Sequence, residues 1–192
     1  MPATEDNRTL VPLHRPSLVE KLFFLFSGIV VSIPIAFFFE PTTGFLKNYF
    51  PGFEAEVLAI AVFAPIIEEF AKAYPLFYRH GESQRSIMML GFLVGVGFGI
   101  TEFFEYVVII GVPILVRLPG IFFHGATAAT IAYGIATKRP AAFYLISVLL
   151  HCSINLIAIY GLSGLPYALV LTITYVLPIT LYRKTSERII PY

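Results

Sequence analysis

The sequence predicts an all-α, polytopic integral membrane protein, a bundle of about six transmembrane helices with both termini in the cytoplasm. Three observations predict it: the composition, six long apolar segments, and the distribution of Lys and Arg. The 192 residues are 57% hydrophobic and 13% charged, whereas a soluble domain usually carries about 25% charged residues. This composition excludes a soluble globule and a disordered chain. A net charge of +1 gives no reason to expect a nucleic-acid partner, so the lipid bilayer is the expected surrounding.

A transmembrane helix needs roughly 20 mostly apolar residues. The first candidate segment ends at Phe39-Glu40-Pro41 rather than at a small-residue cleavage site, so we expect a retained helix and not a signal peptide. The predicted organisation is a cytoplasmic N-terminal segment (1–21), a transmembrane domain (22–182) and a cytoplasmic C-terminal tail (183–192). The six predicted spans are Leu22–Phe39, Val57–Tyr78, Ser86–Ile110, Leu118–Thr137, Ala141–Tyr160 and Leu165–Tyr182.

The positive charges predict the orientation of these spans. With the N-terminus in the cytoplasm, ten Lys and Arg residues fall in cytoplasmic pieces and two, Lys47 and Arg117, fall in outer loops. Cytoplasmic loops of membrane proteins carry the excess of Lys and Arg. The sequence therefore predicts a multi-pass protein of the cell membrane with both termini inside, and it predicts Arg117 as an anchor at the outer interface, with a cap near His124 as the alternative.

Polar and charged side chains nevertheless occur inside the predicted spans. Each charge within the hydrocarbon costs about 2.5–3.5 kcal/mol on insertion scales. They fall on the second to fifth spans, four consecutive helices, which is what one shared internal site requires. The residues are Glu68, Glu69, Lys72, Glu102, Glu105, His124, His151 and Asn155.

Helical periodicity orients the third predicted span. At about 100° per residue, Gly91, Gly95 and Gly99 share one face with Glu102. Glycines four residues apart let a neighbouring helix approach closely. We therefore expect Glu102 to point at a partner helix rather than at lipid.

The second predicted span contains two adjacent glutamates. Glu68 and Lys72 are four residues apart, which predicts an ion pair between them. Glu69 is turned about 100° away, and it is our expected general base because Glu68 has that partner. Pro65 removes one backbone hydrogen bond a turn earlier and predicts a kink.

This set of side chains is typical of hydrolysis by activated water. Carboxylates and imidazoles bind Zn²⁺, a free glutamate accepts a proton from water and passes it to a leaving amine, and an asparagine NH₂ stabilises an oxyanion. The single cysteine, Cys152, adjoins His151, but adjacent side chains on a helix diverge and form no dyad. The predicted catalytic residues are Glu68, Glu69, Glu102, His151 and Asn155. The predicted ligands of a divalent metal, with Zn²⁺ as the candidate, are Glu102, His124 and His151; a metal-free glutamate–water mechanism stays the alternative.

Three spaced motifs resemble the PrsW-type intramembrane proteases, distant relatives of the CAAX prenyl endopeptidases. Glu68-Glu69-Phe70-Ala71-Lys72 resembles E-E-x-x-K. Phe98-Gly99-Ile100-Thr101-Glu102 resembles F-x-x-x-E, and His151-Cys152-Ser153-Ile154-Asn155 resembles H-x-x-x-[DN]. The stretch 117–134 is similar to the family's segment of an arginine, a histidine and a glycine. The resemblance covers about Pro65 to Leu156, roughly half of the chain.

The resemblance implies a membrane-embedded, peptidase-like domain and an intramembrane metalloprotease that hydrolyses membrane-anchored polypeptides. It also implies that the glutamate pair activates water and that the histidines assist or bind metal. The chain departs from the family at Phe103, where Asn is frequent, and at Asn155, where Asp is common. Glu102 stands where the CAAX peptidases carry His, so prenyl-protein processing is the less expected branch.

Two other function classes stay open from the sequence. Buried Glu, Lys and His also form proton relays and ion sites in transporters. A proton- or ion-coupled transporter is expected to show an inverted repeat and paired broken helices, and the sequence has neither signal. A scaffold that binds partner helices through the glycine face would not need the glutamate pair or His151.

Overall fold

The computed structural model describes residues 14–78 and 83–186, and these fold almost entirely into helices. This confirms the all-α class. The predicted cytoplasmic N-terminal segment and C-terminal tail lie outside the described residues over 1–13 and 187–192. The helices are α1 (Leu18–Leu46), α2 (Gly52–Glu56), η1 (Val57–Phe63), α3 (Ala64–Ala73), η2 (Tyr74–Tyr78), α4 (Gln84–Phe104), η3 (Glu105–Ile110), α5 (Ile114–Ala136), α6 (Pro140–Ile159) and α7 (Leu165–Lys184).

Four helical stretches within the described residues are long and apolar enough to cross a membrane, by length and composition. They are Gln84–Ile110, Ile114–Ala136, Pro140–Ile159 and Leu165–Lys184. Two more stretches, α1 and the continuous run from α2 to η2, occupy the places of the first two predicted spans. The count of six spans and the cytoplasmic location of the termini stay predictions.

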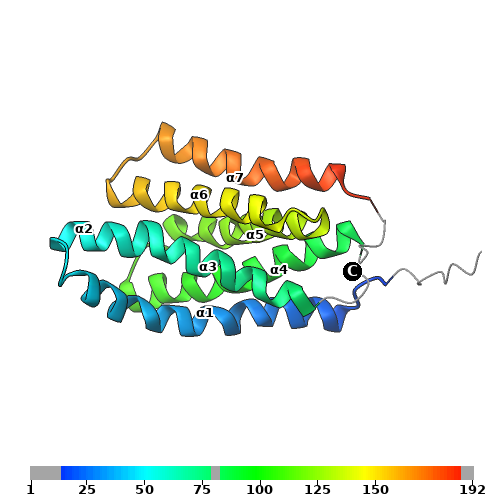
Figure 1. The fold of residues 1–192 in the computed structure, drawn as a ribbon, viewed down its shortest axis with the longest axis horizontal. Helices are drawn as coiled ribbons and strands as arrows, with labels where there is room; N and C mark the ends of the chain where they lie inside the picture. Colours follow the sequence, from blue (N-terminus) through cyan, green and yellow to red (C-terminus); the bar gives the residue numbers. More distant parts are fainter. Residues whose placement is uncertain (1–13, 79–82, 187–192) are drawn as a thin grey trace, which may run out of the picture.

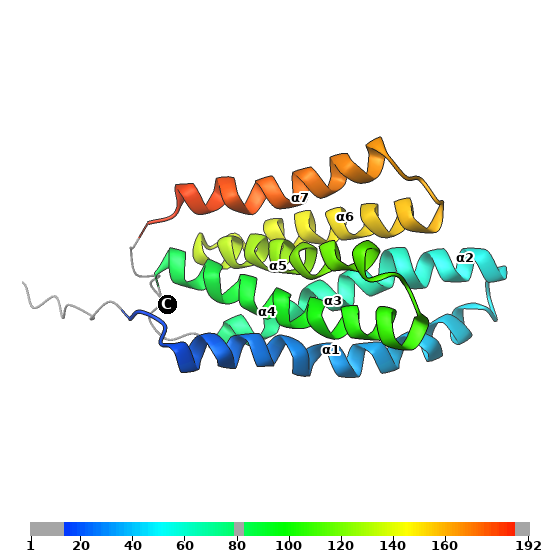
Figure 2. The ribbon, with the colours of Figure 1, turned by 180° about the vertical axis from the view of Figure 1, so that it is seen from behind.

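The helices run back and forth along one long axis (Figures 1 and 2). The start of α1 and the end of α7 lie at the same end of the bundle, called the terminal end below, and α2 lies at the opposite end, called the α2 end. Helix α4 packs most extensively against α5 and α1, and α7 lies at the side of the bundle against α5 and α6.

Glycines bring α4 into backbone contact with both of its neighbours. A Cβ atom on Gly95 would lie 2.1 Å from the carbonyl oxygen of His124 in α5, and one on Gly97 would lie 2.0 Å from the carbonyl oxygen of Leu25 in α1. Gly99 likewise has no room, because its Cβ would lie 2.7 Å from the Cα of Ile121. The predicted glycine face of this helix is therefore confirmed, and a second glycine contact lies on its other side.

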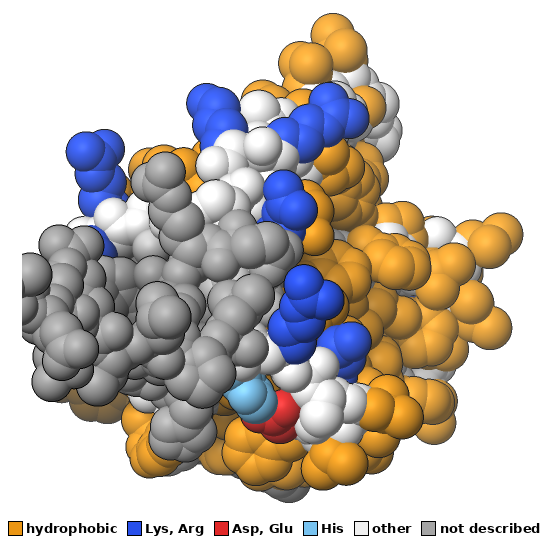
Figure 3. Space-filling model, turned by 90° about the vertical axis from the view of Figure 1, so that its right-hand side faces the viewer, with side chains coloured by type: hydrophobic (Ala, Val, Ile, Leu, Met, Phe, Trp, Pro, Cys, Tyr) orange, Lys and Arg blue, Asp and Glu red, His pale blue; other side chains and the backbone are white. Residues whose placement is uncertain are grey.

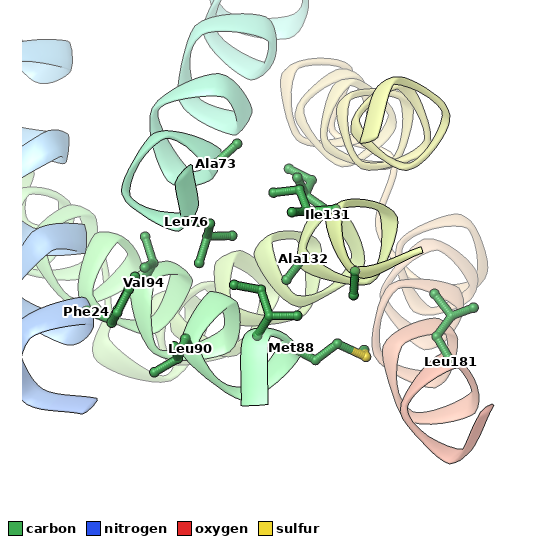
Figure 4. Close-up of a cluster of buried hydrophobic side chains, with 12 residues drawn as sticks. Phe24, Ala73, Leu76, Met88, Leu90, Val94, Ile131, Ala132 and Leu181 are labelled. Atoms are coloured by element: carbon green, nitrogen blue, oxygen red, sulfur yellow. The ribbon is translucent and has the colours of Figure 1, made fainter. Parts of the chain in front are cut away.

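The main apolar core fills the terminal end. It brings together the first turns of α1 and α4 and the last turns of α3, α5 and α7 (Figure 4). Lysines and arginines surround the same end in the space-filling view (Figure 3). The core includes Phe24, Leu76, Leu90, Val94, Ile131 and Leu181.

Candidate active site

Helix α3 holds the glutamate pair and Lys72 inside the bundle. Glu69 and Lys72 are fully inaccessible and Glu68 is buried. The helix continues from the π-helix η1, and Pro65, which has no N–H, sits in its first turn. The charged side chains thus lie directly after an irregular helical segment, and π-helical turns are frequent at functional sites.

The Lys72 ammonium lies between α3 and α5. Its Nζ donates to Glu69 Oε1 at 2.6 Å and to Thr127 Oγ1 at 3.4 Å, and it lies 2.9 Å from His124 Nδ1. An ammonium carries donors only, so Nδ1 of His124 is the acceptor. The predicted ion pair between Glu68 and Lys72 is therefore wrong. A lysine side chain reaches partners three or four residues away on a helix, and here His124 and Thr127 hold it on the Glu69 side.

His151 of α6 faces both glutamates. Its Nδ1 lies 2.8 Å from Glu69 Oε1, and its Nε2 lies 3.7 Å from Glu68 Oε2. With the Nδ1 proton directed at the Glu69 carboxylate, the lone pair of Nε2 faces Glu68. His151, Ser147 and Asn155 point inward from one face of α6, as their spacing predicts.

Glu102 joins α4 to α5 through two contacts. Its Oε2 is hydrogen-bonded to His124 Nε2, and its Oε1 lies 3.0 Å from the Arg117 guanidinium. That guanidinium also stacks on Tyr106, 3.7 Å from the ring centroid. Glu102 therefore points at a partner helix as predicted. Arg117, predicted as an interface anchor or a cap near His124, turns its head inward to this carboxylate, which itself binds His124.

The Asn155 side chain contacts backbone. Its Nδ2 donates to the carbonyl oxygen of Ile60 at 2.8 Å. Ile60 belongs to the π-helix η1 that leads into α3. The sequence suggested this amide as an oxyanion donor, and in the structure one of its two N–H groups is bound to the chain itself.

A cavity of about 890 Å³ reaches the site from the α2 end. The mouth of the cavity is formed by the end of α1, the end of α2 and those turns of α4 to α6 that lie nearest to the α2 end. Glu68 and Glu102 both lie on its deeper wall, whereas Glu69 is not among the residues that line it. The other polar residues of the wall are Ser32, Lys47, Glu56, Thr101, Glu105, Tyr106, Arg117 and Asn155.

Three buried side chains could share a metal ion. One ligand atom from each of Glu68, His124 and His151 lies within 4.8 Å of the others. Glu68 Oε2 and Glu69 Oε2 are buried carboxylate oxygens with no hydrogen-bond partner among the residues that the structure describes. Two imidazoles and a carboxylate match the ligands that Zn²⁺ takes in catalytic sites. The group contains Glu68 where the sequence predicted Glu102, whose carboxylate is engaged by His124 and Arg117.

A comparison of the sequence with protein-family models finds a match. The sequence model of the PrsW family of intramembrane metalloproteases matches residues 18–182. The chain belongs to the PrsW family. A PrsW chain is expected in a membrane, and the apolar helices agree with that assignment. No curated protein and no solved structure matches this PrsW chain.

Three contributions to the candidate site were not predicted from the sequence. Lys72 was given the wrong partner, the contact of Arg117 with Glu102 was not predicted, and Thr127 was not considered. A signal for Thr127 exists, because it follows His124 by three residues and so shares its helical face. The sequence indicates the inward orientation of the Arg117 side chain less clearly. The indication is the acidic face of α4, which lies opposite the start of α5.

Proposed function

We propose that this PrsW-family protein is an endopeptidase with six membrane-crossing segments that cuts membrane-anchored polypeptides from the α2 end of the bundle. The excess of Lys and Arg at the terminal end supports a cytoplasmic location for that end. The substrate segment then reaches the site from the opposite side of the membrane, through the cavity. The observation that carries the proposal is the pair of carboxylates, Glu68 and Glu102, on the wall of a cavity backed by two buried histidines.

In the metal-free mechanism, Glu68 is our proposed general base. It lies on the cavity wall with one buried oxygen that lacks a partner, whereas Oε1 of Glu69 is already bound by Lys72 and His151. The Glu68 carboxylate accepts a proton from water as the water oxygen attacks the peptide carbonyl carbon. The same proton passes to the leaving amine as the C–N bond breaks. This reverses the assignment that followed from a Glu68–Lys72 pair.

The neighbouring groups hold this arrangement in place. Glu69 fixes the ring orientation of His151 through Nδ1, and Lys72 balances the Glu69 charge. Glu102 fixes His124 in the same way, with Arg117 as its counter-charge. Buried charges are tolerated when each has a partner of opposite sign.

In the metal-dependent alternative, Glu68 is a ligand instead of the base, and Glu68, His124 and His151 are the residues that would hold a divalent metal. The carboxylates behind the two histidines are the outer partners that such ligands usually have. When bound, a Zn²⁺ ion would lower the pKa of water and polarise a carbonyl. His124 Nδ1 lies against Lys72 in the structure, so Lys72 has to leave that nitrogen for it to serve as a ligand.

The test is cleavage of a quenched, membrane-anchored peptide by protein purified in detergent. Glu68→Gln is expected to lower turnover by about a thousandfold or more, because it removes the proton acceptor while it keeps the side-chain shape. Glu54→Gln, on an exposed position of α2, is the matched control and should retain activity. Full activity of Glu68→Gln would overturn the assignment.

Two further measurements separate the alternatives. Chelation should abolish cleavage and Zn²⁺ should restore it if the metal is required, and elemental analysis then finds about one ion per chain. Cleavage that survives chelation favours the metal-free mechanism. Proton flux in liposomes without any cleavage would identify a transporter and refute the protease proposal.

A further inference from the structure

Within the proposed protease, we infer that Asn155 is a positioning residue that replaces the backbone donor missing at Pro65, and so holds the turn that delivers Glu68 and Glu69. The inference rests on the proposed function only for its activity readout. Its structural part rests on hydrogen bonds of η1, α3 and α6.

The first step is the hydrogen-bond register of η1. The N–H of Ala64 donates to the carbonyl of Ala59, five residues back, as in a π-helix. The next rung in this register would join the N–H of residue 65 to the carbonyl of Ile60. Residue 65 is proline and has no N–H, so this rung lacks its donor.

The second step is the donor that takes its place. Asn155 Nδ2 lies 2.8 Å from that same Ile60 carbonyl oxygen. Without this amide the Ile60 carbonyl would lose its protein donor, and its hydrogen bond would depend on water from the cavity that Ile60 and Asn155 both line. The side chain of α6 therefore completes the hydrogen-bonding of a different helix.

The third step is how the contact bears on the site. Asn155 lies one turn from His151, which binds Glu69, and Tyr144 on the same helix donates to the Ile66 carbonyl at 2.8 Å. Helix α6 thus grips the η1–α3 segment on both sides of Pro65. The glutamates follow within one turn, so an error in this register rotates them away from the histidines.

The experiment is a double-mutant cycle in the full-length protein. Asn155→Ala should lower activity by about 10–100-fold and the thermal midpoint by about 5 °C, because the Ile60 carbonyl loses its donor. Pro65→Ala restores an N–H at the vacant rung. The double variant Asn155→Ala, Pro65→Ala should therefore have an activity within about threefold, and a thermal midpoint within about 2 °C, of the Pro65→Ala single variant.

The matched control is Pro178→Ala, which removes a proline from the interior of α7, a helix that does not line the cavity. Asn155→Ala should lower activity and the thermal midpoint by the same amounts in the Pro178→Ala background as in the wild type. If Asn155→Ala fails to accumulate in membranes, Asn155→Leu, closer in volume, takes its place, and accumulation becomes the readout.

The outcomes discriminate between roles. An amide that binds the substrate oxyanion cannot be replaced by an N–H at residue 65, so a double variant with restored stability but no activity overturns the inference. Lack of rescue of either quantity overturns it too. If the wild type cleaves no peptide, the proposed protease function fails, but the stability cycle still decides the role of Asn155.

Discussion

The terminal end of the bundle is packed solid, whereas the α2 end is hollow. At the terminal end, apolar side chains such as Leu76 and Leu90 are fully buried, and further along α4, up to the level of the site, glycines bring this helix into contact with α5 and α1. At the α2 end, the helices enclose a cavity of about 890 Å³ with charged groups on its wall. The candidate site lies where the two regions meet. The difference teaches that tight packing on the side of the terminal end holds the candidate reacting groups in position, while the cavity on the side of the α2 end leaves them accessible.

The largest expected effect comes from a bulky side chain in the glycine contact between α4 and α5. Gly95→Leu places its Cβ 2.1 Å from a backbone oxygen, so α4 and α5 must separate and carry Glu102 away from His124. We expect no folded, active protein in detergent, measured by thermal unfolding and by peptide cleavage. Gly44→Leu, where nothing lies within 4 Å of the added Cβ, should unfold at the wild-type temperature. Equal behaviour of the two variants would contradict the comparison.

The next effect is removal of the buried cation. Lys72→Met leaves the Glu69 carboxylate uncompensated at a fully inaccessible position. Breaking a buried ion pair on one side costs about 3–5 kcal/mol, which corresponds to about 10 °C in the thermal midpoint. Differential scanning fluorimetry measures it. A second change, Glu69→Gln, should recover part of the loss, because it removes the unpaired charge.

A smaller effect is expected from narrowing the cavity without disturbing the core. Ala158 lies on the cavity wall and is exposed. Ala158→Phe should lower kcat/KM by about tenfold, equivalent to about 1.4 kcal/mol, with an unchanged unfolding temperature. Ala168→Phe, at an exposed position of α7, is the control and should leave kinetics unchanged. Wild-type kinetics for Ala158→Phe would show that substrate does not use this cavity.

The smallest effect concerns the ion pair at the cavity mouth. Lys47 Nζ and Glu56 Oε1 are 3.5 Å apart, and both side chains are about half exposed. Exposed pairs contribute about 0–1 kcal/mol and are screened by salt. Lys47→Met should therefore shift the thermal midpoint by less than about 2 °C at low salt and not at all at high salt. If Lys47→Met lowered the thermal midpoint as much as Lys72→Met does, the buried and the exposed ion pair would not differ in their contribution to stability, contrary to our expectation.

The sequence predicted the helical class and the convergence of polar side chains because both depend on composition and on helical periodicity. Glycines at four-residue spacing predicted that Glu102 faces a partner helix, and the same periodicity placed His151 and Asn155 on one face. Such predictions need only the helical periodicity of about 3.6 residues per turn within a single helix.

The pairing of Lys72 and the partner of Asn155 could not be predicted in the same way. Lys72 reaches either glutamate by local geometry, and the choice depends on His124 and Thr127 of another helix. Asn155 binds a carbonyl that is free only because η1 is π-helical before a proline. Arg117 turns inward because Glu102 and Tyr106 offer it a counter-charge and a ring. These features depend on contacts between helices and not on any single stretch of sequence.

The backbone contacts of α4 also bear on how the protein responds to lipids of different length. A bilayer thicker or thinner than the helices forces them to tilt or slide, and layers of flexible side chains between helices would absorb part of that motion. Between α4 and α5 no such layer exists at Gly91, Gly95 and Gly99, where even a methyl group would collide. We therefore expect changes in bilayer thickness to be taken up by helices other than α4 and α5, with the spacing between Glu102 and His124 insulated from the composition of the membrane.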